Sequence, residues 1–196
     1  PIPIKIAFLN KKGSLVKFSL NKSKLRYEHV YLLSKSKDKV SVICNEKEIT
    51  PSILRDFSAP VLLKTDIKIN EYIHILKFDN DSFNKWDAAQ NLYLNFFFKK
   101  INLNILIKTL RELILEKKVN YSLMALLLEL PSRNTLENLS KDVDPISIFK
   151  RKKDFMKRIA LGLQEVFEIN ALKLYKSKIQ DDKSFGERLL LEKILK

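Results

Sequence analysis

The sequence predicts a small β-sandwich over residues 1–66, followed by an all-α, superhelical or solenoid-like domain over residues 67–196. Three observations lead to this fold class. Short segments in the first third alternate apolar and polar residues with the period of two that marks strands. From about Ile67 the apolar residues recur with the period of a helix instead. The successive helical segments have short connections, which is typical of stacked helices.

The first predicted strand begins close to residue 1. Its apolar residues Ile2, Ile4, Ile6 and Phe8 fall on one face. Pro3 has no N–H to donate to a neighbouring strand, so we expect this strand either to lie at a sheet edge or to start there.

Four further strands are predicted between polar turns. The turn signal at residues 10–13 contains Gly13, and the segment after it can return as the hairpin partner of the first strand. Short strands of this kind favour an antiparallel sheet or sandwich. The four segments are 15–20, 28–33, 39–44 and, directly after Pro60, 61–65.

The first well-marked helix begins near residue 82. Asp81 or Ser82 is a suitable N-cap. Its apolar face is wide, which predicts a helix covered on more than one side, with Trp86 as a core anchor and the aromatic residues 93–98 in the core. This face carries Phe83, Trp86, Ala89, Tyr93 and Phe97.

The remaining helices are predicted over 104–117, over 121–130, from Asp144 to about Tyr175, and from Lys183 onward. The pair Asp144-Pro145 is a strong helix start because an acidic N-cap precedes proline at the first helical position. The apolar face of that helix is expected to carry Ile148, Phe155, Ile159, Leu163 and Val166.

The formal net charge of +14 raises the possibility of nucleic-acid binding. Both predicted parts carry the charge equally, at about +7 each, and the cations are 30 Lys and 7 Arg rather than the Arg that phosphate recognition favours. Residues 150–153 form the densest basic run, and Phe149 and Phe155 beside it are expected at or near the apolar stripe rather than free to stack on bases. We therefore interpret the run as a solvated helix face and expect no specific nucleic-acid partner.

No catalytic, cofactor-binding or metal-ligating residue is predicted in this sequence. A zinc site of the His-Glu-x-x-His type needs two histidines one turn apart, and His29 and His74 stand alone and 45 residues apart. Cys44 has no histidine beside it, and three glycines are too few for a phosphate-binding loop. The acidic residues Asp79, Asp81, Asp181 and Asp182 stand at helix starts or turns, where capping explains them.

The same features bear on location. No apolar run approaches the roughly 20 residues of a membrane span, and no leader peptide is visible. Cys44 is the one cysteine, which fits a reducing compartment and a buried strand position. We therefore expect a cytoplasmic protein without a membrane partner.

Two segments resemble a known family. Residues 51–61 read Pro-Ser-Ile-Leu-Arg-Asp-Phe-Ser-Ala-Pro-Val, and residues 81–90 read Asp-Ser-Phe-Asn-Lys-Trp-Asp-Ala-Ala-Gln. Both are similar to the junction between two non-catalytic domains of the aminopeptidase N family of zinc metallopeptidases. Further landmarks occur in the same order at Ala7–Asn10, Leu130–Ser132 and Val143–Pro145.

The resemblance implies that residues 1–66 are the later strands of a partial, Ig-like sandwich and residues 67–196 the first part of the C-terminal helical superhelix. The family's zinc ligands, general-base glutamate and Gly-x-Met-Glu-Asn motif have no counterpart here, so no site residue is transferred. The chain is thus expected to be a non-catalytic structural segment of a zinc-dependent aminopeptidase that removes N-terminal residues from peptides. Its expected partners are the upstream catalytic domain and, for the parent, peptide substrates. The alternative is a stand-alone helical scaffold that binds a protein partner.

The landmark residues also carry structural expectations. Arg55 is expected to bond carbonyl groups or a carboxylate where the sandwich meets the helices. Phe57 is expected to fill a hydrophobic socket at the same place.

Overall fold

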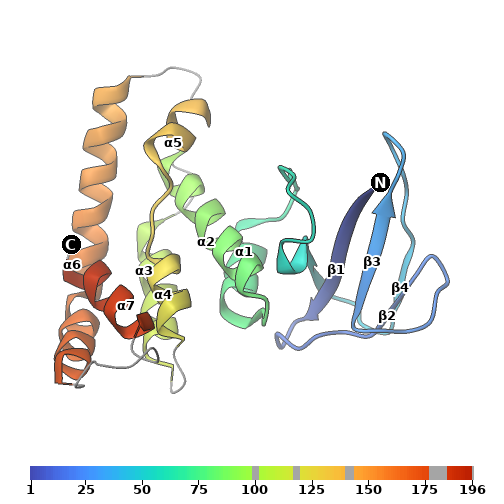
Figure 1. The fold of residues 1–196 in the computed structure, drawn as a ribbon, viewed down its shortest axis with the longest axis horizontal. Coiled ribbons are helices and arrows are strands. Elements are labelled where there is room, and N and C mark those ends of the chain that lie inside the picture. Colours follow the sequence, from blue (N-terminus) through green and yellow to red (C-terminus); the bar gives the residue numbers. More distant parts are fainter. Residues whose placement is uncertain (99–101, 117–119, 140–143, 177–184, 196) are drawn as a thin grey trace. The chain divides into compact units, whose positions relative to one another are not determined.

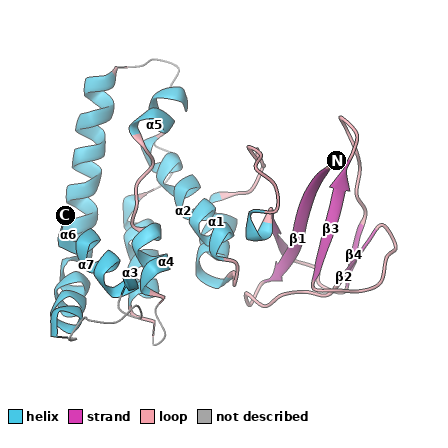
Figure 2. Ribbon diagram, in the orientation of Figure 1, coloured by secondary structure: helices cyan, strands magenta, loops and turns pink. Residues whose placement is uncertain are grey.

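The structure is a computed structural model that describes residues 1–98, 102–116, 120–139, 144–176 and 185–195. The chain forms two compact units, residues 1–89 and residues 90–196. Figures 1 and 2 show the strands in the first unit, while the second contains helices in its described part. The boundary falls inside a helix, so the predicted domain division at residues 66/67 stays a prediction.

The first unit is built on two antiparallel sheets. β1 (Ile2–Asn10) pairs with both β3 (Glu28–Leu33) and β5 (Ile49–Ile53), which gives the order β3-β1-β5. β2 (Phe18–Leu20) pairs with β4 (Val42–Cys44) in a second, two-stranded sheet. A core of Phe8, Val16, Phe18 and Leu20 lies among these strands. The sandwich prediction is therefore confirmed for its first four strands, of which the second and fourth are shorter than predicted, and β5 was not predicted.

For the strand that contains Pro3, the sequence left two alternatives: a strand at the sheet edge, or a strand that begins near Pro3. β1 is the central strand of its sheet rather than an edge strand, and Pro3 lies near its beginning. β5 pairs only with the stretch of β1 from Ile6 onward. The N–H of Lys5 points away from β3 and donates to Ser58 Oγ at 2.9 Å. Because N–H direction repeats every two residues, the missing donor of Pro3 faces the side that β5 does not reach.

Two strand predictions are corrected by the structure. Residues 61–65 form no strand, and Leu62 is 98% exposed there. Residues 15–20 do not return as a hairpin partner of β1, because Leu15 makes one isolated bridge to Leu9 and β2 pairs with β4 instead. A β-rich composition alone does not decide which neighbour supplies the ladder hydrogen bonds.

Two helices follow the strands. A short 3₁₀ turn, η1 (Arg55–Phe57), precedes α1 (Ile69–Phe78) and α2 (Ser82–Phe97). Asp81 caps α2, since its Oδ1 accepts the Asn84 N–H at 2.8 Å, as predicted. The turn after β1 contacts α1: a ring nitrogen of His74 lies 2.9 Å from the Asn10 carbonyl oxygen.

The second unit contains five described helices after the end of α2. These are α3 (Leu103–Ile114), α4 (Tyr121–Leu127), α5 (Arg133–Leu139), α6 (Pro145–Lys176) and α7 (Phe185–Leu195). Asp144 caps α6 by accepting the Ile146 N–H at 3.0 Å, so the predicted helix start is confirmed. α5 was not predicted from the sequence.

The core of the second unit is aromatic around Phe155 of α6. Phe155 is fully buried and contacts the rings of Tyr93, Phe96 and Phe97, with centroids 5.6, 4.5 and 5.4 Å away. Burial raises the pKa of the Tyr93 phenol, whose hydroxyl donates to the Leu127 carbonyl. The aromatic stretch is thus core for Tyr93 and Phe97, as predicted, whereas Phe98 is 39% exposed.

Candidate functional site: the Arg55 network

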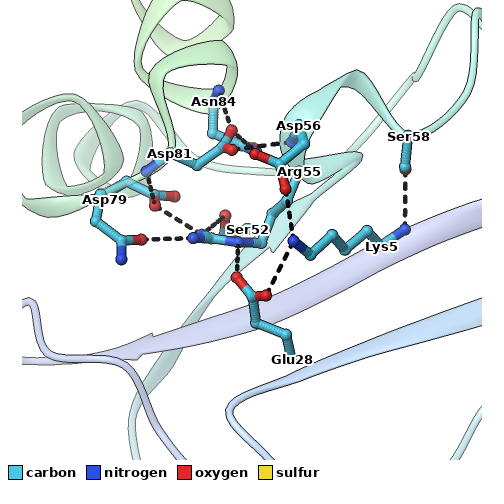
Figure 3. A network of polar contacts seen from close by, with 10 residues as sticks. Lys5, Glu28, Ser52, Arg55, Asp56, Ser58, Asp79, Asp81 and Asn84 are labelled. Carbon is cyan, nitrogen blue, oxygen red and sulfur yellow. Dashed lines mark hydrogen bonds and ion pairs between the residues drawn. The ribbon is translucent and has the colours of Figure 1, made fainter.

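The most connected polar group of the first unit is the guanidinium of Arg55, whose side chain is 3% exposed. It donates from Nε to Glu28 of β3 at 2.8 Å and from Nη1 to Ser52 of β5 at 2.8 Å. It also donates from Nη1 to Asp79 at 2.7 Å and from Nη2 to Asn80 at 2.5 Å, both between α1 and α2. One side chain therefore ties two strands to the start of the helices (Figure 3). The expectation that Arg55 bonds a carboxylate there is confirmed.

Asp81 forms a second link between the same elements. Its Oδ2 accepts the backbone N–H of Asp56 in η1 at 2.9 Å, while its Oδ1 caps α2 through Asn84. Its own N–H donates to Asp79 Oδ1 at 2.9 Å. The acidic residues at this turn therefore do more than cap a helix, because they also hold η1 in place.

Lys5 of β1 closes the exposed side of the network. Its Nζ lies 3.0 Å from Glu28 Oε2 and also donates to Asp56. Figure 3 shows the Lys5 chain running along β1 between these carboxylates and Ser58. Glu28 is consequently shared between Lys5 and Arg55.

The charges of the network set the direction of several pKa values. Burial opposes the charge on Glu28, yet hydrogen bonds from Lys5 and Arg55 lower its pKa below the usual value. The hydrogen bond from Lys5 lowers the pKa of Asp56, and the same bond raises the pKa of Lys5. Burial also opposes the charge on Arg55, but the neighbouring Asp79 raises its pKa. The network is thus arranged to keep all of these groups charged.

The backbone between β5 and η1 is strained. Leu54, Asp56 and Phe57 have φ angles of 61°, 53° and 51°, in the left-handed region that non-glycine residues rarely occupy. Each such residue costs on the order of 1 kcal/mol and persists only where its surroundings hold it. Here the bonds of Arg55 and of the Asp56 N–H on either side of the turn provide that restraint.

The side chains of this arrangement bond to one another and to the backbone of the elements around them. Its carboxylates are engaged by cations or backbone donors, and it contains no histidine, cysteine or other activated nucleophile. Among the buried side-chain nitrogen and oxygen atoms of the described residues, one has no hydrogen-bond partner, and it is the Oδ2 of Asp79.

The histidines and Cys44 lie outside this network. A ring nitrogen of His29 lies 3.0 Å from the Phe18 carbonyl oxygen. Each of the two histidines therefore has one ring nitrogen in a hydrogen bond with a backbone carbonyl group. Within the described ranges, no group of three or more His, Cys, Asp or Glu side chains is placed to hold a metal ion. Cys44 ends β4 and is half-buried against the core of the sandwich, rather than fully buried as expected. Asp181 and Asp182 lie outside the described residues.

Three aromatic expectations are wrong. Trp86 is 37% exposed and so is no core anchor, and Phe57 is 54% exposed and fills no socket within the unit. On α6, Phe149 is 62% exposed beside the exposed cations Lys150 and Lys153. The predicted apolar face of α6 is nevertheless confirmed, since Ile159 is half-buried and its other four residues are buried: Ile148, Phe155, Leu163 and Val166. No helix in the described part of the chain has the length and apolar character needed to cross a bilayer.

Comparison with family models divides the chain much as its secondary structure does. Residues 1–66 match DUF3458, a domain of unknown function described as an Ig-like fold. Residues 69–196 match DUF3458_C, a domain of unknown function described as ARM repeats.

Curated relatives include aminopeptidase N from three bacteria. The Escherichia coli K12 protein is 27% identical over 129 residues, which is 59% of this chain and 14% of that protein. The Haemophilus influenzae protein is 29% identical over 131 residues, or 60% of this chain and 15% of that protein. The Caulobacter vibrioides protein is 28% identical over 122 residues, which is 59% of this chain and 14% of that protein. The matched region therefore spans about a seventh of these relatives.

A solved structure shows the same fold. The crystal structure of Legionella pneumophila aminopeptidase A in complex with aspartic acid matches 99% of this chain and 24% of its own, with a TM-score of 0.78 and 21% sequence identity. At this identity the likeness concerns the fold alone.

Proposed function

The chain belongs to the aminopeptidase N family, in its Ig-like and ARM-repeat DUF3458 region, and on that basis we propose that it is a non-catalytic structural segment of a zinc-dependent aminopeptidase. The parent would remove N-terminal residues from peptides in the cytoplasm. The segment would brace an upstream catalytic domain and begin the helical wall beside it.

The observation that carries this proposal is the Arg55 network. Arg55 bonds groups from β3, from β5 and from the turn between α1 and α2, and Asp81 adds a second link from that turn to η1. A buried guanidinium with four acceptors fixes these elements in one arrangement, because removing either Arg55 or Asp79 leaves the other as a buried charge without its ion-pair partner. The network lies within the first unit, where it joins the strands to α1 and to the start of α2, and a link of this kind suits a structural segment.

Zinc belongs to the parent in this proposal, not to this segment. The residues described here do not fit a zinc site, since His29 and His74 each hold a backbone carbonyl and no third ligand accompanies either. A catalytic zinc needs three protein ligands and an open position for water. No step of peptide hydrolysis is therefore assigned to a residue of this chain.

The proposal is tested on the native gene product that carries this sequence. We expect the purified product to release the N-terminal residue from aminoacyl p-nitroanilides, to lose that activity in 1,10-phenanthroline and to regain it with zinc. The 196-residue chain expressed alone serves as the matched control and is expected to be inactive. A native product without aminopeptidase activity would contradict the proposal and favour the alternative, a helical scaffold that binds a protein partner.

A further inference from the structure

Three aromatic side chains form a surface on the first unit, called here the aromatic surface: Phe57, Phe83 and Trp86. The centroid of the Phe83 ring lies 5.1 Å from that of Phe57 and 5.9 Å from that of Trp86. Phe57 is 54% exposed and Trp86 is 37% exposed, while Phe83 between them is half-buried. Aromatic residues in contact and open to solvent are typical of the anchor residues at protein interfaces.

Phe57 is a poor residue for its position if only the local fold is considered. Its φ of 51° favours glycine, asparagine or aspartate, and its exposure favours a polar side chain. The Arg55 network does not need an aromatic ring there, because its contact with η1 uses the side chain of Arg55 and the backbone N–H of Asp56. The strain is held in place by the network and directs a large apolar ring toward solvent. Stored strain of this kind is characteristic of functional positions.

We infer that the aromatic surface is a docking surface that inserts Phe57 and Trp86 into an apolar socket on another domain of the same, longer polypeptide. This inference rests on the proposed function, which supplies a parent chain. The matched region spans only 14–15% of its curated relatives, so most of such a parent lies outside the 196 residues.

The exposed charge next to the aromatic surface indicates the character of the socket. Asp56 directly precedes Phe57 and its side chain is 68% exposed, whereas Asp79 and Asp81 of the adjoining network are buried. A basic group at the rim of the socket would complement Asp56. A second copy of the chain is a poorer occupant, because two chains of +14 repel each other.

Hydroxyl-radical footprinting of the native polypeptide tests the inference. Phe18 and Phe155 are fully buried within the chain and give the reference for a protected phenylalanine. We expect the labelling of Phe57 to fall to the level of Phe18, although 54% of its surface is exposed in the 196-residue chain. Labelling of Phe57 and Trp86 at the rate of exposed side chains would overturn the inference.

The intact mass of the same sample separates the inference from the proposed function. If the polypeptide is much larger than 23.0 kDa and Phe57 is labelled freely, the docking surface is wrong while the proposed function stands. If the polypeptide has a mass near 23.0 kDa, both are wrong, whichever way Phe57 is labelled.

A substitution links the two anchors. Phe57→Asn suits the left-handed backbone and removes the ring, so we expect it to increase the labelling of Trp86 in the native polypeptide while Phe18 stays protected. Unchanged protection of Phe18 shows that the sandwich is still folded. Phe185→Asn is the matched control, since Phe185 is 56% exposed and belongs to the other unit. Trp86 labelling that is the same in both variants would contradict a shared socket.

Discussion

Arg55 is the residue on which the first unit depends most directly. Its guanidinium neutralises Asp79, whose side chain is fully buried, and holds Glu28 and Ser52 from two strands. A buried ion pair contributes little over an apolar pair of the same shape, but loss of one partner leaves the other charged and desolvated. The contribution of Arg55 to stability is therefore measured as the loss that follows its removal.

We predict that Arg55→Ala lowers the free energy of unfolding by about 3–5 kcal/mol. The measurement is urea denaturation of the chain followed by far-UV circular dichroism. Arg133→Ala is the control, because Arg133 is 59% exposed in an i,i+4 pair with Glu137 and should cost less than about 0.5 kcal/mol. Equal losses for the two variants would show that the network is not the joint described here.

The motif around Phe57 suggests a buried ring whose removal would be costly, but the structure predicts a small effect on stability. Since it is 54% exposed and strained, Phe57→Ala should cost less than about 1 kcal/mol in the isolated chain, mainly through its contact with Phe83. The same denaturation measurement checks this value. A loss of about 3 kcal/mol or more would mean that the ring is buried after all.

The network also predicts how stability changes with pH. The pKa values of Glu28 and Asp56 are lowered in the folded protein, so their contribution is present above their ordinary values near 4.5 and 3.8 and is lost as the pH falls through the folded values. The pKa of Lys5 is raised, so its contribution is present below 10.5 and is lost as the pH rises through the folded value. Thermal unfolding from pH 7 to pH 3 should show a fall in Tm that is smaller in Glu28→Gln. An identical fall in both proteins would remove Glu28 from the explanation.

At the scale of elements, the turn after β1 has to approach α1 closely. Gly13 has a φ of 83°, and a Cβ placed there would lie 2.4 Å from the Cβ of Phe78. The contact of His74 with the Asn10 carbonyl holds the same turn against α1. Gly13 is therefore required for two reasons, its dihedral angle and its lack of a side chain.

Gly13→Ala should accordingly destabilise the chain by more than about 1 kcal/mol, since an alanine there is both strained and overlapping. Differential scanning calorimetry would show it as a lower Tm. Gly162→Ala is a useful comparison: its backbone is helical, so alanine there adds no strain from the dihedral angle, and its Cβ would lie 2.6 Å from Cδ1 and 2.9 Å from Cγ2 of Ile107, so that the change tests the close approach alone. An unchanged Tm for Gly13→Ala would argue against the close approach.

Local sequence signals predict much of the order of the helices and strands, but they do not predict which strands pair. The Asp144-Pro145 start of α6 and the Asp81 cap of α2 are local hydrogen-bond arrangements, and both occur as expected. The strand expected at residues 61–65 is absent, because an apolar run does not determine whether a neighbouring strand is available.

The site was only partly visible in the sequence. Arg55 stood out as a charged residue in an apolar, proline-bounded motif, whereas Lys5, Glu28 and Ser52 gave no signal in their strands. Glu28 lies 27 residues from Arg55 in the sequence, and Lys5 reaches the network through Glu28 and Asp56, so the fold alone brings these two strands to Arg55. Phe149 and Trp86 were misjudged because helical periodicity tells which residues share a face but not which face is covered.

At the scale of the whole molecule, several large apolar side chains are exposed to solvent in both units. Phe57 and Leu62 are exposed in the first unit, and Phe149, Leu161 and Leu172 are more than half exposed on α6. Exposed apolar residues that adjoin one another mark interaction surfaces, and Phe57, in ring contact with Phe83, belongs to such a group. They agree with a segment that functions as part of a larger protein.

The intact mass of the native gene product, measured by mass spectrometry, tests the central claim most directly. A segment of an aminopeptidase predicts a single polypeptide several times heavier than 23.0 kDa that contains this sequence. A native product near 23.0 kDa would contradict the account, since no catalytic domain would then share the chain.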